Sequence, residues 1–136
     1  MGIIETPWDF LIEKKIGKHV IKYVNLEEIC QGGPEIGEIY INNNKINGFK
    51  FGGPLVYNNS KVAIPLFVKG FLNKGFKIVI IDLNNNSLSE FSNLKDLVIL
   101  KSFEENEITF YSSIDRNDLK IIDLRIEKKK TRLISF

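Results

Sequence analysis

The sequence predicts an all-β fold, mainly an antiparallel meander of about 8–10 strands with at most one or two short helices. Three observations support this prediction. Runs of apolar, β-branched and aromatic residues have the length of strands, as at 62–68 and 76–83. Asn-rich turns interrupt them, with Asn-Asn-Asn at 42–44 and again at 84–86. Alanine, the best helix former, appears once, at Ala63.

The length and composition indicate one domain. A chain of 136 residues is long enough for a hydrophobic core and too short to suggest two domains. Hydrophobic residues make up 43% of it and charged residues 26%, as in ordinary globular proteins. We therefore expect a single domain over residues 1–136, in which an N-terminal strand and short-helix region, 1–31, precedes a β-meander, 32–136.

The N-terminal region contains two candidate strands and one candidate helical turn. Residues 7–12 and 19–24 are apolar enough to form strands. Asn25, followed three residues later by Glu28, resembles a capping box, in which the two side chains cap the first backbone amides of a helix. We expect a short helical turn from this point to about Gln31.

Two Gly-Gly-Pro tripeptides, at 32–34 and 52–54, each come directly before a predicted strand. The strands that follow them are 35–41 and 55–57, and a further strand, 45–51, returns between them. Glycine permits unusual backbone angles and proline lacks an amide donor, so each tripeptide predicts a sharp break in the chain. Neither is followed by the Lys and Ser/Thr of a phosphate-binding loop, which favours a structural role.

A fainter repeat relates 77–83 to 120–124, because both contain Ile-Ile-Asp-Leu. The offset of 41 residues between Asp82 and Asp123 lies within the period of about 40–45 residues found in propeller blades. A propeller needs about four blades or more, so two blade-like repeats predict a curled or two-layered sheet. The other strands of the two units are 62–68 and 87–91 in the first, and 107–111 and 131–136 in the second.

The core should come from alternate residues along these strands. Consecutive Ile80 and Ile81 predict a strand covered on both faces and therefore central in its sheet. Pro65 removes one ladder donor, which predicts an edge or a bulge there. The predicted core residues are Ile39, Ile41, Phe49, Phe51, Val62, Ile64, Leu66, Ile78, Ile80, Phe91, Val98, Leu100, Ile108, Phe110, Ile121 and Leu124.

Groups able to carry out catalysis are few. His19 is the only histidine and Cys30 the only cysteine, so we expect no metal site, no disulfide and an unreactive, hydrophobic role for Cys30. Asp82 and Asp123 each follow an apolar pair, a position in which aspartate usually caps a turn. We predict no catalytic residues and no cofactor, and keep a small carboxylate-dependent hydrolase as an alternative.

The charge distribution also limits the choice of partners. The net charge is +2, so no strong field favours nucleic acid or an anionic membrane. The one basic cluster, Lys128–Lys130 with Arg125 and Arg132, leaves a single-stranded nucleic-acid-binding domain as a second alternative. Lysines on an edge strand also prevent aggregation, and we favour that interpretation. The sequence shows no signal peptide and no apolar run of about 20 residues, so we expect a cytoplasmic protein without a membrane partner.

An acidic hairpin is the best candidate for binding a partner. Glu104, Glu105 and Glu107 surround a predicted turn, and Tyr111 follows on the next strand. Exposed carboxylates accelerate encounter with a basic partner, and tyrosines often supply much of the binding energy. We therefore predict that these four residues contact a partner protein.

The segments 32–42 and 51–54 carry a resemblance to a known class of protein. Gly-Gly-Pro-Glu-Ile-Gly-Glu-Ile-Tyr-Ile-Asn, continued by Phe-Gly-Gly-Pro, resembles the small, strand-rich bacterial immunity proteins of polymorphic or contact-dependent growth inhibition toxins. The similarity covers about residues 32–92. It implies a cytoplasmic protein that binds one cognate toxin domain and blocks its active site. Many such toxins are nucleases with acidic inhibitors, and the net charge of +2 departs from that pattern, leaving the toxin's class open.

Overall fold

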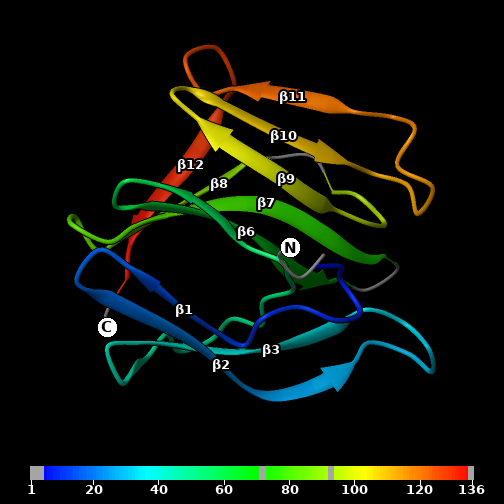
Figure 1. The fold of residues 1–136 in the computed structure, drawn as a ribbon, viewed down its shortest axis with the longest axis horizontal. Coiled ribbons are helices and arrows are strands. Elements are labelled where there is room, and N and C mark those ends of the chain that lie inside the picture. Colours follow the sequence, from blue (N-terminus) through cyan, green and yellow to red (C-terminus); the bar gives the residue numbers. More distant parts are fainter. Residues whose placement is uncertain (1–4, 71–72, 92–93, 135–136) are drawn as a thin grey trace.

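The protein is built from three antiparallel β-sheets stacked in layers (Figure 1). The structure is a computed structural model that describes residues 5–70, 73–91 and 94–134. All regular elements in these ranges are strands, which confirms the all-β prediction. They number twelve within the described ranges, more than predicted, because pairing also forms in very short segments such as β4 and β5. The described chain contains no helix that could cross a membrane.

Neighbouring strands in each sheet are consecutive in the sequence, except that β12 pairs with β8. The four-stranded sheet contains, in order, β1 (Glu13–Ile16), β2 (His19–Glu28), β3 (Glu35–Ile41) and β4 (Asn44–Lys45). The five-stranded sheet contains β12 (Lys129–Leu133), β8 (Ser87–Phe91), β7 (Lys74–Asp82), β6 (Lys61–Lys69) and β5 (Val56–Asn58). The three-stranded sheet contains β11 (Lys120–Asp123), β10 (Glu107–Tyr111) and β9 (Ile99–Glu104).

The five-stranded sheet is the middle layer, and both of its faces are buried. On β7, Ile78 and Ile80 pack toward the three-stranded sheet, whereas Val79 and Ile81 pack toward the four-stranded sheet. Successive side chains of a strand point to opposite faces, so a strand in this position has to be apolar throughout. The prediction from the Ile-Ile pair, a central strand covered on both faces, is confirmed.

Two hydrophobic cores result, one on each side of the middle sheet. The first includes Ile21, Tyr23, Ile39, Ile41, Phe51, Val62, Ile64, Val79, Ile81 and Leu88. The second includes Ile36, Phe76, Ile78, Ile80, Phe91, Val98, Leu100, Phe103, Ile108, Phe110 and Ile122.

Most of the predicted core residues are buried, with three exceptions. Phe49 and Leu124 are partly buried. Ile121 is 58% exposed, and its neighbour Ile122 is buried in its place. The prediction for Ile121 was wrong because strand alternation has a period of two, so an error of one residue assigns the side chain to the opposite face.

The predicted helical turn at residues 25–31 is also wrong. β2 continues through this segment to Glu28, with an irregularity in its pairing to β3 between Val24 and Glu27. Asn25 occupies the irregularity at φ 54°, and its amide donates to Glu38 at 2.7 Å rather than capping a helix. The carboxylate of Glu28 accepts from the backbone amide of Gly32 at 3.0 Å.

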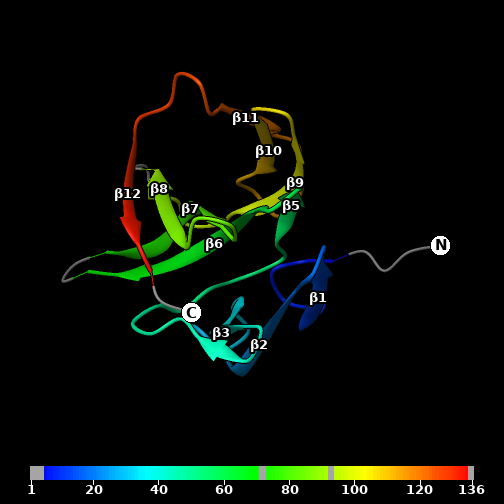
Figure 2. The same cartoon turned by 90° about the vertical axis from the view of Figure 1, so that its left-hand side faces the viewer.

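The two blade-like units do not form in full. β10 pairs with β11, as β6 pairs with β7, but β12 leaves the three-stranded sheet and pairs with β8 of the middle sheet. Figure 2 shows this crossing from one layer to the other. The second unit therefore keeps two of its three predicted strands, β10 and β11, and its predicted last strand pairs with the first unit. The end of that predicted strand, 135–136, lies outside the described residues.

The second Gly-Gly-Pro has the structural role that the sequence indicated. A Cβ atom on Gly53 would lie 2.6 Å from ring atoms of Phe10, so only glycine fits without a shift of that ring. The amide of Gly52 donates to the carbonyl oxygen of Pro65 at 2.9 Å. Pro65 is not at a bulge, since β6 pairs with β7 without a break from Lys61 to Lys69, and it is not on an edge strand, since β6 lies between β7 and β5. The backbone nitrogen of Pro65 faces away from β7, on the side of β5. Pairing with β5 ends at Ala63, so no amide donor is needed for that ladder at Pro65.

The repeated Ile-Ile-Asp-Leu sequence provides a test of this layered arrangement. Ile80 and Ile121 hold the same position in the repeat, but Ile80 is 7% exposed and Ile121 is 58% exposed. Ile80→Ala should lower the free energy of unfolding by about 2–4 kcal/mol. Ile121→Ala should change it by about 0.5 kcal/mol or less. Urea denaturation of the two variants measures both values, and equal losses would contradict the arrangement.

Candidate interaction site

The β9–β10 hairpin carries the acidic residues singled out in the sequence. Glu104 ends β9 and is paired across the ladder with Glu107, which begins β10. Glu105 lies between them in the turn at φ 51°. All three side chains are exposed. Like charges at facing strand positions repel one another, so this turn is costly unless a cation lies near.

Arg125 supplies that cation, which the sequence analysis had grouped with the lysines of 128–130. Its guanidinium donates to the carboxylate of Asp123 at 2.9 and 3.0 Å. These bonds and the backbone amide of Arg125 lower the pKa of Asp123 to about 2. Asp123 raises the pKa of Arg125, with smaller contributions from Glu107 and Glu105. The hairpin and Arg125 enclose an open hollow of about 370 Å³.

Tyr111 does not lie with the three glutamates. It ends β10, four residues from Glu107, which places it about 13 Å further along the strand. Its ring lies 5.9 Å from the ammonium of Lys101. The aromatic side chain that borders the acidic hairpin is instead Tyr57 of β5, which is 48% exposed. No local pattern links Tyr57 to the hairpin, so sequence reasoning missed it.

A groove of about 440 Å³ joins Tyr57 to the hairpin. Glu104 borders both this groove and the hollow at the hairpin tip, so the two form one continuous surface. The amide of Asn58 donates to the carbonyl oxygen of Glu105 at 3.4 Å and ties β5 to the turn. The groove is lined by Glu5, Lys14, Pro54, Leu55, Val56, Tyr57, Leu100, Lys101, Ser102, Phe103 and Glu104.

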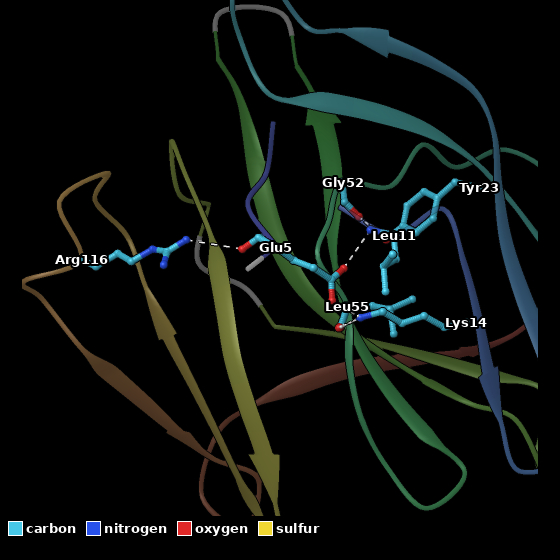
Figure 3. A network of polar contacts seen from close by, with 7 residues as sticks. All are labelled: Glu5, Leu11, Lys14, Tyr23, Gly52, Leu55 and Arg116. Carbon is cyan, nitrogen blue, oxygen red and sulfur yellow. Dashed lines mark hydrogen bonds and ion pairs between the residues drawn. The ribbon is translucent and has the colours of Figure 1, made fainter. Parts of the chain in front are cut away.

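Glu5 and Lys14 form a largely buried ion pair at this groove, with 17% of each side chain exposed (Figure 3). The Lys14 ammonium donates to Glu5 at 2.6 Å and to the carbonyl oxygen of Leu55 at 3.1 Å. The other carboxylate oxygen of Glu5 accepts from the amide of Leu11 at 3.0 Å. Arg116, from the loop after β10, donates to the Glu5 carbonyl oxygen at 3.4 Å. Side chains and backbone from all three layers therefore meet at this groove.

Tyr23 fixes the backbone behind the same region. Its hydroxyl is buried and donates to the carbonyl oxygen of Gly52 at 2.6 Å. Burial raises the pKa of the phenol well above its ordinary value, and the nearby charge of Glu5 raises it further. The bond holds the second Gly-Gly-Pro, and with it the entry to β5, against the four-stranded sheet.

Other candidate groups do not converge. The described residues include no group of three or more His, Cys, Asp or Glu side chains placed to hold a metal ion. His19 begins β2 and Cys30 lies two residues beyond its end, so the ten-residue strand separates them by about 30 Å. Cys30 is exposed in the bend after β2, which contradicts the expected hydrophobic role.

The two repeated aspartates cap turns, as the sequence predicted. Asp82 accepts from the amides of Asn84 and Asn85 at 3.0 and 3.1 Å, and Asp123 accepts from the amide of Arg125 at 2.9 Å. Both carboxylates therefore stabilise the turns that follow their strands.

The chain matches no protein-family model, and comparisons with curated proteins and with solved structures also gave no match.

The buried phenol of Tyr23 makes stability depend on pH in the alkaline range. In the unfolded chain it ionises near pH 10, whereas in the folded protein it ionises at higher pH. The stabilisation that comes from this raised pKa is therefore complete below pH 10. It is lost as the pH rises from 10 through the pKa of Tyr23 in the folded protein. Tyr23→Phe should lower the free energy of unfolding at neutral pH by about 1–3 kcal/mol, because the Gly52 carbonyl loses its donor.

Urea denaturation at pH 7 and above pH 10 tests both effects. The Tyr23→Phe variant should lose less stability between these pH values than the unchanged protein. The exposed Tyr57, changed to Phe, serves as the matched control and should behave as the unchanged protein does. The assignment fails if both variants follow the same pH profile.

Proposed function

We propose that the protein is a stoichiometric inhibitor of the immunity type, which binds a cognate toxin domain and occludes its active site. One observation carries the proposal: three exposed glutamates on a β-hairpin continue without interruption into a groove bordered by an exposed tyrosine. This combination of peripheral carboxylates and an aromatic side chain suits a basic partner surface.

The hairpin is a firm support for such a contact. Phe103 and Ile108 flank the turn, and both are buried in the core between the middle and three-stranded sheets. The Asn58–Glu105 hydrogen bond adds a link to β5. A surface held in this way loses little conformational entropy on binding, which favours tight association.

The charge around the β9–β10 turn, rather than the net charge of the chain, supports a basic partner. Around the turn stand Glu104, Glu105, Glu107 and Asp123, opposed by the single guanidinium of Arg125. These four carboxylates and one guanidinium give the hairpin tip a local net charge of −3, although the whole chain is at +2. Active sites that bind nucleic acid are basic, so a nuclease toxin is the partner class that this surface fits best.

The area of contact would extend beyond the hairpin. A stable inhibitor complex buries about 1,600 Å² in total, so the groove and the outer face of β9 would also be covered. We assign the role of aromatic anchor to Tyr57 rather than to Tyr111, because Tyr57 borders the same groove as Glu104.

Charge reversal on the hairpin tests the acidic part of the surface. We take the product of the adjacent upstream gene as the candidate toxin, and co-expression of it with the unchanged protein should permit growth. Glu104→Lys combined with Glu107→Lys should reduce the association rate with that toxin roughly tenfold at low salt, because electrostatic steering is lost. Surface plasmon resonance measures the rate. Glu13→Lys, at an exposed acid on β1 in another sheet, is the matched control and should leave it unchanged.

If growth arrest persists with the unchanged protein and no complex co-purifies, the immunity function is wrong. If the control variant lowers the association rate equally, the hairpin is not the contact surface, but the proposed inhibitor function is not contradicted.

Tyrosine truncation tests the aromatic part. Tyr57→Ala should weaken binding of the same toxin by about 2 kcal/mol, roughly a 30-fold increase in Kd, since a central tyrosine contributes this much at a typical interface. Tyr111→Ala is the matched control and should change Kd by less than about threefold. Titration calorimetry on both variants decides the assignment, and the reverse ranking would restore Tyr111 as the anchor.

A further inference from the structure

β12 presents a free strand edge on the side of the molecule opposite β9 (Figure 2). It is the outermost strand of the middle sheet, and all five of its side chains are exposed. Strand edges carry unpaired amide and carbonyl groups that can bind another extended segment.

The pairing register shows which backbone groups face outward. The amide of Ile134 donates to the carbonyl oxygen of Asn86, and the β12–β8 ladder continues in the same register. In an antiparallel ladder every second residue bonds to the neighbouring strand, so Lys130 and Arg132 bond to β8. Lys129, Thr131 and Leu133 therefore direct their amide and carbonyl groups away from β8. The 2.8 Å contact between the hydroxyls of Thr131 and Ser89 fits this assignment, since side chains approach more closely at the alternate pairs.

The other edges within the described ranges are less open. β5 and β9 contact each other, and β4 is only two residues long. On β11 the carbonyl oxygen of Asp123 already accepts from the amides of Ile126 and Glu127. β1 is only four residues long and carries one acid with its two lysines, and one of these lysines, Lys14, is paired with Glu5.

The charges beside β12 are strongly positive. Glu90 of β8 is shared between Lys77, at 3.2 Å, and Arg132. Within the described part of the chain, none of the ion pairs involves Lys128, Lys129 or Lys130. Four lysines, one acid and a shallow hollow of about 190 Å³ lie together at this place: Lys77, Glu90, Lys128, Lys129 and Lys130.

We propose that the β12 edge binds an extended, acidic segment of a partner protein as an additional strand. The outward amide and carbonyl groups would pair with its backbone, and Lys130 and Arg132, which lie on the same face of β12, would attract carboxylates at alternate positions of the incoming strand. Like charges on two facing copies of β12 would repel, so the same side chains exclude self-association. This surface is separate from the acidic hairpin and does not depend on the inhibitor function.

A peptide of defined chemistry tests the proposal. The probe is a fluorescent, end-blocked peptide with glutamate at alternate positions and threonine between them, and its Kd is measured by fluorescence anisotropy. Binding should weaken with salt, because it depends on charge. Lys130→Glu should raise Kd about fivefold or more. Lys15→Glu, an exposed lysine on the edge strand β1, is the matched control and should change Kd less than twofold.

Two further measurements separate strand pairing from general charge attraction. Complete N-methylation of the peptide removes its amide donors and should abolish binding. In NMR spectra the amide protons of Lys129, Thr131 and Leu133 should become protected from exchange when the unmethylated peptide is bound. Unchanged protection, equal binding of the methylated peptide, no binding of the probe, or tighter binding of oligothymidylate than of the peptide would each overturn the proposal.

Discussion

Burial of both faces of β7 is the constraint on which the rest of the structure depends. A strand with Ile78 and Ile80 on one face and Val79 and Ile81 on the other is stable only if a layer covers each face. The N-terminal strands provide one cover and β9–β11 provide the other. Because each outer sheet has only one buried face, its turns and edges remain at the surface. The acidic hairpin is such a turn, and its exposure follows from the layering.

Much of the fold was predictable because its signals are local. The Asn-rich turns, the doubly apolar β7 and the turn-capping roles of Asp82 and Asp123 all depend on a few adjacent residues. The errors concern choices that adjacent residues do not determine. Asn25 and Glu28 have the spacing of a helix cap, but pairing of β2 with β3 buries Tyr23 and overrides that local preference.

The repeat misled for a related reason. Ile80 and Ile121 are followed by the same three residues, Ile-Asp-Leu, yet β7 lies between two layers and β11 lies at the edge of a sheet. A strand at an edge with one free face cannot bury both residues of an Ile-Ile pair. Pairing of β12 with β8, rather than with β11, is also a non-local choice, since the two strands are about 40 residues apart. Likewise, the sequence identified the acids of the candidate site because they are adjacent. It did not identify Tyr57, Arg125 or the Glu5–Lys14 pair, because only the folded chain brings these residues close to the hairpin.

The net charge of +2 conceals two surfaces of opposite sign. Glu104, Glu105 and Glu107 lie at the end of one hairpin, and the lysines of 128–130 lie along an edge of a different sheet. At physiological salt the Debye length is about 8 Å, and exposed charges separated by more than this distance are largely screened from each other. A basic partner approaching one and an acidic partner approaching the other would each meet a local field of favourable sign. The three-layer arrangement makes this separation possible, because it places the two segments on different sheets with a hydrophobic core between them.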